Sequence, residues 1–300
     1  MKKKLLLLLP FLLLAGCTTK EKPDIVVTSF VSYDAVKNIV GDKLFVKNIV
    51  PWGSELHDFE PTPRDITDIN AAKLFVYTSP LLETWAKSLV TNENSFDMST
   101  CAQIEHEEGE TSNNEHHHDH DSLHFWTDPH LYKGIMDMLL PVINDISPAN
   151  SDYFTANHQN YTGRLEASGT ELRNFLTPLS DPTIFFAGHN ALGHFASRFG
   201  LTIKTINEGY TPDVDFVSQE IVNFINEIKA AGVHHLFIEE LVEPRVGNLI
   251  KNELAKENYE ITLLELHGYH NITPAQAKEG VTYADLFAQN VANLKQAFSD

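Results

Sequence analysis

The chain has 300 residues, of which 41 are acidic and 22 are basic, so its formal charge at pH 7 is -19. So acidic a surface argues against binding to nucleic acid and against adsorption on anionic lipid, because like charges repel. It suits the attraction of cations, although solubility alone would also account for it, and the length is ample for two lobes.

The first residues predict export and a lipid anchor. Three lysines precede an apolar run at residues 5–15, which leads into the sequence LAGC ending at Cys17. This order is typical of a secretory signal, and the run is too short to span a bilayer. LAGC resembles the bacterial lipobox, so we expect a signal peptide at 1–16, lipid on Cys17 and a tether at 17–23. An ordinary signal peptide with a coincidental cysteine is the alternative.

Lipidation of Cys17 would leave Cys101 as the one remaining cysteine, so no intramolecular disulfide is expected. Cleavage would also remove three lysines and lower the formal charge from -19 to -22. The mature protein would be anchored outside the cytoplasmic membrane, on the cell surface or the periplasmic side, without spanning it.

Apolar runs rich in β-formers alternate with segments of helical periodicity along the chain. The predicted strands are at residues 25–30, 45–50, 74–77, 183–187, 201–206, 236–239 and 261–266. The predicted helices are at residues 33–40, 63–72, 131–146, 149–175, 191–199, 216–230, 246–257 and 283–298. Such alternation predicts parallel sheets flanked by helices. We therefore expect an α/β protein with two lobes, at 24–147 and 178–300, joined by one long rigid helix at 148–177 and separated by a cleft.

Residues 105–123 form an acidic segment that is rich in histidine. The stretch from Glu105 to His124 carries six of the 15 histidines and has no apolar residue before Leu123. It cannot bury enough apolar surface to become ordered, so we expect a mobile loop. The imidazoles of this loop would bind metal ions weakly. They belong to His106, His116, His117, His118 and His120. The alternative is a solvated acidic linker in which the histidines have no function.

A tight metal site needs coordinating side chains on elements with fixed positions. In α/β lobes, bound molecules and ions lie beyond the carboxyl ends of the strands. Histidines occur in such loops in both halves. They are His57 in GSELHDFEPTP, His124 in LHFWTDP, His189 in FFAGHNALGHF, and His267 and His270 in LELHGYHNIT. We expect this set to converge on the cleft between the lobes. Four imidazoles would satisfy tetrahedral Zn(II) and leave no open position.

In these and further motifs the chain resembles the cluster A-I substrate-binding lipoproteins of bacterial zinc and manganese ABC importers. The matching motifs are GSELHDFEPTP, the acidic histidine loop with LHFWTDP, GHNALGHFASRFGL, INEGYTPD and HNITPAQAKEGVTYADL, which together cover essentially the whole mature chain. The resemblance implies two α/β lobes linked by a long rigid helix, with metal bound between them. It places three ligands on His57, His124 and His189. Manganese-type members often have glutamate at the third position, so histidine there favours zinc.

The fourth ligand departs from the family pattern, in which this position is usually a carboxylate about a dozen residues before a Gly-x-x-Tyr-like stretch. Spacing back from the sequence GVTY at 280–283 places it on His270. His267, three residues earlier, is the competitor, and Glu265 and Glu208 are weaker alternatives. A neutral fourth ligand would leave the site at +2 with Zn(II).

Acidic residues near these motifs are expected to support the site. Glu60 and Asp128 would hold the ligating imidazoles in one tautomer. Glu208 would cap or brace its own loop. Glu239 ends a predicted strand and Glu240 follows it; both could reach the cleft, but we expect them to bond to a neighbouring loop.

The predicted function is capture of Zn(II) outside the cytoplasm and its delivery, as cargo, to an ABC permease in the membrane by a monomeric protein. A manganese-delivering homologue is the first alternative. A secreted zinc hydrolase is less expected, because the chain has no His-Glu-x-x-His and no Gly-x-Ser-x-Gly motif. An adhesin is also less expected, since no adhesive repeat is present. We therefore expect no enzymatic activity.

Overall fold

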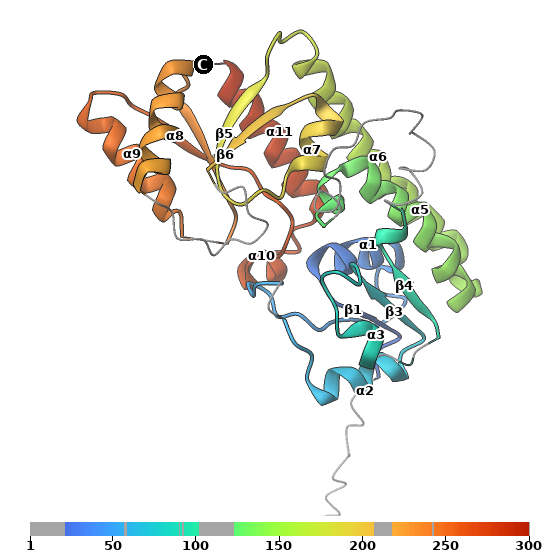
Figure 1. Cartoon of the computed structure of the whole chain (residues 1–300). Helices are drawn as coiled ribbons and strands as arrows, with labels where there is room; N and C mark the ends of the chain where they lie inside the picture. Colours follow the sequence, from blue (N-terminus) through green and yellow to red (C-terminus); the bar gives the residue numbers. More distant parts are fainter. Residues whose placement is uncertain are drawn as a thin grey trace, which may run out of the picture.

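The computed structural model describes residues 22–56, 59–89, 91, 93–101, 123–206, 218–241 and 243–299. These residues form two lobes with long helices running along one side of both (Figure 1). Each lobe is built on one four-stranded sheet. Among the helices of these residues, none combines the length and the apolar character that crossing a membrane requires.

The first lobe contains a sheet in the order β2-β1-β3-β4 with all neighbours parallel. Its strands are β1 (Ile25–Val27), β2 (Val46–Asn48), β3 (Leu74–Tyr77) and β4 (Ser95–Asp97), and its helices are α1 (Phe30–Val40), α2 (Pro63–Ala71), α3 (Ala86–Leu89) and α5 (Pro129–Ile146). Successive side chains of a strand point to opposite faces. Val27 and Val76 therefore join the main core with α1 and α5, whereas Val26 and Phe75 pack against Ile69 of α2.

The second lobe repeats this strand order as β6-β5-β7-β8, again with parallel neighbours. Its strands are β5 (Thr183–Ala187), β6 (Thr202–Thr205), β7 (His235–Ile238) and β8 (Thr262–Glu265), and its helices are α7 (Gly193–Phe199), α8 (Ser218–Ala231), α9 (Arg245–Lys256), α10 (Pro274–Glu279) and α11 (Tyr283–Ser299). Phe186 and Phe237 face the main core, and Phe185 and Leu236 face a second core under α8 and α9. The central strands β1, β3, β5 and β7 are thus buried on both faces, which explains their apolar runs.

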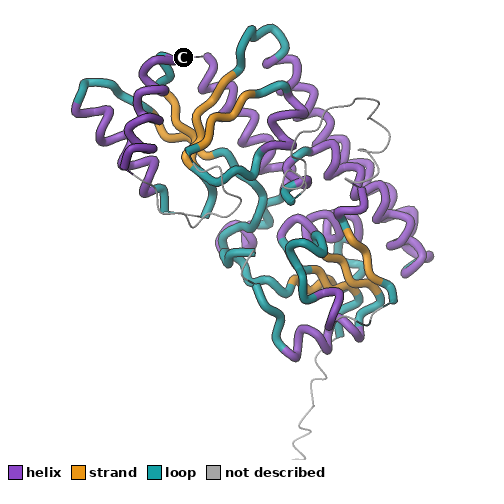
Figure 2. Tube along the Cα trace, in the orientation of Figure 1, coloured by secondary structure: helices purple, strands orange, loops and turns teal. Residues whose placement is uncertain are grey.

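Helix α6 (Ser151–Leu176) lies beside both lobes and has 26 residues, which corresponds to a length of about 39 Å. It is tied to the first lobe by the Asn157 side-chain amide, which donates to Ile39 O at 3.1 Å. It is tied to the second lobe by an ion pair between Arg164 and Asp285. Figure 2 shows the two sheets well apart, with helices between and around them. The predicted architecture of two parallel α/β lobes joined by a long helix is confirmed.

The structure differs from the predicted elements mainly at short segments. The strand predicted at 25–30 ends at Val27, because Ser29 caps α1 through a reciprocal bond with Ser32 and the helix begins at Phe30. Strand β4 was missed because only one of its three residues is apolar. The other missed elements are also short: α3, α10, and the 3-10 turns η1 (Phe125–Thr127) and η2 (Pro148–Asn150).

Candidate metal centre

Three histidines from three separate loops converge where the two lobes meet. His124 immediately precedes the η1 turn, His189 follows β5, and His270 follows β8. One ring nitrogen of each lies within 4.8 Å of the others, and the ring centroids are 4.9 to 5.3 Å apart. All three residues are at most 7% exposed. Buried imidazoles at this spacing form a nitrogen donor set suited to a transition-metal ion.

Two glutamates from the loop after β7 hold two of these imidazoles. His189 Nδ1 lies 2.6 Å from Glu239 Oε1, and His270 Nδ1 lies 2.9 Å from Glu240 Oε1. A carboxylate on Nδ1 favours the tautomer with its proton on that nitrogen, which leaves Nε2 as the ligand atom for an ion. Strand β7 lies between β5 and β8 in the sheet, so its carboxyl end brings both glutamates beside the two histidine loops.

The charge of Glu240 is embedded in this polar cluster. The carboxylate accepts hydrogen bonds from Gly268 N at 2.8 Å and from His270 N at 3.2 Å. Burial alone would raise the pKa of Glu240, but the imidazoles of His267 and His270 and the Gly268 N–H hold it well below its usual range. Burial acts to lower the pKa of His270, yet the bond to Glu240 outweighs this and raises it. The hydrogen bonds of Glu240 therefore favour its charged form.

The loop after β8 approaches itself closely, and glycine is required there. A Cβ at position 268 would lie 2.8 Å from His270 Cε1 and 3.0 Å from His270 Nδ1. Tyr269 adopts a positive φ of 64°. This tight turn directs the His270 ring toward His124 and His189.

His267 has different contacts from His270. Its Nδ1 accepts a hydrogen bond from Tyr269 N at 2.9 Å, and its own backbone N–H and C=O bond to the side chain of Asn290 on α11. Burial lowers the pKa of the His267 imidazole. Among the described residues, two groups of side chains are close enough to hold an ion: His124 with His189 and His270, and Glu239 with Glu240 and His270. Neither group includes His267 or Glu265. His267 thus shapes the loop that presents His270.

Several predicted site residues lie outside the described part of the chain. They are His57, Glu208, Cys17 and the loop histidines His106, His116, His117, His118 and His120. Glu60 is described and is exposed.

The role predicted for Asp128 needs correction. Its Oδ1 accepts a hydrogen bond from His130 N and so caps α5, and its Oδ2 accepts from Arg198 Nε at 2.7 Å. Asp128 therefore anchors the start of α5 to α7 rather than holding a ligating imidazole. The expected bonding of Glu239 and Glu240 to neighbouring loops is confirmed, because they accept from His189 N and Gly268 N. The sequence did not predict that these two carboxylates also hold the imidazoles of His189 and His270. Their position directly after β7 was the signal that could have identified them.

Comparisons with known proteins agree with this geometry. Residues 25–297 match the family model described as zinc-uptake complex component A, periplasmic. The chain is 28% identical to the high-affinity zinc uptake system protein ZnuA of Bacillus subtilis over 96% of this chain and 94% of that protein. It is 26% identical to the zinc-binding lipoprotein AdcA of Streptococcus pneumoniae over 99% of this chain, and it spans 61% of the length of that relative.

A solved structure also resembles the whole described fold. The metal-dependent lipoprotein YcdH from Bacillus subtilis superposes with a TM-score of 0.74 at 26% identity. The match covers 91% of this chain and 98% of that chain.

Proposed function

The chain belongs to the zinc-uptake component A family, and from this premise we propose that it captures Zn(II) outside the cytoplasm and delivers it to an ABC permease. The observation that carries the proposal is the group of three buried imidazoles, two of them held by glutamates. Zn(II) is the cargo of this site. A site in which only nitrogen atoms coordinate the ion suits Zn(II) and disfavours Mn(II), which prefers oxygen ligands.

We propose His57 as the fourth ligand, which would complete a tetrahedral site with His124, His189 and His270. Support comes from the residue beside His270. The Asn271 side-chain amide donates to Pro51 O at 2.9 Å and to Ser54 O at 2.8 Å. The loop that leads toward His57 is therefore attached to the loop that presents His270.

The remaining parts of the proposal concern the acidic histidine segment, the lipid anchor and the lobe boundaries. The acidic histidine segment at 105–123 would hold zinc transiently before it reaches the buried site. Lipid on Cys17 would keep the protein at the outer side of the cytoplasmic membrane, with residues 17–23 as tether. Lobe boundaries at residues 147 and 177 stay a prediction.

A competition titration tests the proposal. The chain from residue 18 onward, freed of metal, is titrated with zinc and with manganese against a chelator of known affinity. We expect one tight zinc equivalent and manganese binding that is weaker by orders of magnitude. His189→Ala should lose the tight equivalent, whereas His234→Ala, which removes an exposed histidine of the same lobe, should retain it. Equal affinity for both metals would contradict the proposed selectivity.

A further inference from the structure

Trp126 lies at the junction of the loops that carry the three histidines. Its side chain is fully buried, and its indole Nε1 donates to Gly268 O at 3.0 Å. The ring meets His124 and His270 edge-on, with centroid distances of 5.2 and 5.8 Å. The residue that follows His124 by two positions thus holds the backbone of the His270 loop.

The same turn reaches the His189 loop through Thr127. Its hydroxyl donates to His124 O at 2.9 Å and lies 3.4 Å from Ala191 O. Ala191 N in turn donates to His189 O at 2.8 Å. The η1 turn therefore contacts both histidine loops of the second lobe, although it leads into α5 of the first.

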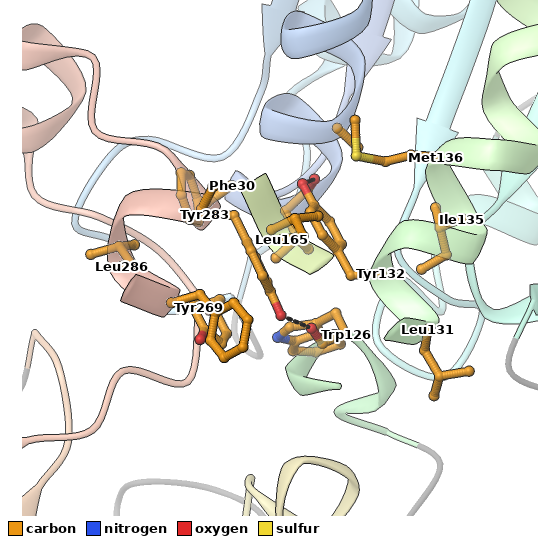
Figure 3. Close-up of a cluster of buried hydrophobic side chains, with 14 of the residues drawn as sticks. Phe30, Trp126, Leu131, Tyr132, Ile135, Met136, Leu165, Tyr269, Tyr283 and Leu286 are labelled. Carbon is orange, nitrogen blue, oxygen red and sulfur yellow. Dashed lines mark hydrogen bonds between the residues drawn. The ribbon is translucent and has the colours of Figure 1, made fainter. Parts of the chain in front are cut away.

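A column of tyrosines fixes the position of Trp126. Tyr283, the first residue of α11, is stacked between Tyr132 and Tyr269, with ring centroids 4.0 Å apart on each side. Its hydroxyl donates to Trp126 O at 2.9 Å, as Figure 3 shows. Asn290 donates to the Tyr269 hydroxyl, so the far ring is also held. Trp126 is consequently bonded at its backbone to α11 and at its indole to the His270 loop.

We propose that Trp126 is a positioning residue that holds the histidine loops together before any metal binds. We call the bonds of Trp126 to Gly268 and Tyr283, together with the contact of Thr127 with Ala191, the clasp. This inference rests on the proposed function, since it assigns how the same site is prepared for its ion. Each bond of the clasp joins protein atoms alone, so we expect the clasp to hold the three imidazoles in place without an ion. A prearranged site loses less conformational freedom on binding and therefore binds more tightly.

The test compares two tryptophan substitutions. Trp126→Phe keeps an aromatic ring but removes the indole N–H. Trp85→Phe is the matched control, since Trp85 is equally a buried tryptophan, 6% exposed, that packs near Phe75 on the other face of the first sheet. We expect Trp126→Phe to weaken zinc binding by about 10-fold, the lower end for loss of a residue that supports metal ligands. Trp85→Phe should leave the zinc affinity unchanged.

Two further measurements separate positioning from a general loss of stability. The visible spectrum of the Co(II)-loaded chain reports ligand geometry, and we expect it to change in Trp126→Phe but not in Trp85→Phe. In the metal-free wild-type chain, the Trp126 indole proton should exchange slowly with solvent. If Trp126→Phe does not fold, Tyr283→Phe replaces it, because it keeps the stacked ring and removes the bond to Trp126 O.

The outcomes are distinct. Tight zinc binding by wild type with unchanged affinity and Co(II) spectrum in the substituted chain overturns the clasp and leaves the proposed function intact. A fast-exchanging indole proton in the metal-free chain overturns the clasp as well. If wild type binds no zinc tightly, the proposed function fails and the positioning role fails with it, even where slow exchange shows the bond to Gly268.

Discussion

At the scale of single residues, His270 and His267 lie three positions apart but face different partners. The His270 ring contacts the rings of His124 and His189, whereas His267 Nδ1 accepts a backbone hydrogen bond within its own loop. We expect His270→Ala to reduce zinc affinity by more than the ~10–100-fold typical of residues that only support ligands. His267→Ala should reduce it by less. Chelator competition on the two purified variants measures both.

Thermal unfolding provides a second, independent comparison of zinc binding by the His270→Ala and His267→Ala variants. Tighter binding of zinc to the folded chain gives greater stabilisation, because the free energy of unfolding rises with the logarithm of the ratio of zinc concentration to Kd. The zinc-induced rise in Tm should therefore be smaller for His270→Ala than for His267→Ala. The opposite order would assign the ligand role to His267.

Glu240 holds the His270 imidazole but is not one of the proposed zinc ligands. Glu240→Gln keeps the size of the side chain but removes the charge that accepts from His270 and Gly268. We expect zinc affinity to fall by about 10-fold, within the range for partners that orient metal ligands. Glu265→Gln, at an exposed position of the neighbouring strand, is the control and should bind zinc as wild type does. An unchanged affinity in Glu240→Gln would show that the carboxylate does not set the tautomer of His270.

At the scale of elements, the apolar pattern was sufficient for the long helices, which bury one face, and for the central strands, which are buried along most of their length. It was insufficient for β4, whose pattern Ser95-Phe96-Asp97 has a single apolar residue at the sheet edge. The same limit applies to the site. Strand ends could be located from sequence, but which polar side chain turns inward depends on contacts between distant loops. Glu239 and Glu240 bond to residues 28 to 50 positions away in sequence, and no local pattern encodes that.

The acidic histidine segment is an element whose role can be tested by removal. Deleting residues 105–122 while keeping His124 should leave the one tight zinc site nearly intact, since the three clustered histidines are supplied by other loops. The additional weak zinc equivalents should disappear, because the deletion removes the five imidazoles that we propose hold zinc transiently. Zinc titration by calorimetry counts both classes of site. Loss of the tight site on deletion would mean that the segment supplies a primary ligand.

At the scale of the whole molecule, a buried carboxylate connects the parts that join the lobes. Asp34 on α1 accepts hydrogen bonds from Tyr132 on α5, from Tyr161 on α6 and from the backbone N–H of Tyr283 on α11. Figure 3 shows Tyr132 and Tyr283 side by side in this packed interior. Burial raises the pKa of Asp34 from 3.8 to about 6, although the two tyrosine hydroxyls act to lower it.

This shift predicts how folding stability depends on pH. Between pH 3.8 and about 6 the folded chain holds a proton on Asp34 that the unfolded chain has released, so the free energy of unfolding falls as pH rises through this window. The contribution is on the order of 3 kcal/mol, is fully present below the window and is lost above it. Asp34→Asn should remove this dependence. The difference in stability between wild type and Asp34→Asn, measured by urea unfolding from pH 4 to 8, should shrink with rising pH and then level off.

A control separates Asp34 from the many exposed acids of the chain. Asp152→Asn, at an exposed position of α6, should parallel wild type at every pH. A difference between wild type and Asp34→Asn that stays constant across the range would show that the buried carboxylate does not titrate in this window.

The central claim is that zinc binds among His124, His189 and His270. Its most direct measurement is an anomalous difference map at the zinc edge, from crystals grown with equimolar zinc and manganese. We predict a single strong peak about 2.0–2.1 Å from one nitrogen of each of these three imidazoles, the usual Zn–N distance. A manganese signal at that position, or a zinc peak away from the three imidazoles, would contradict the account.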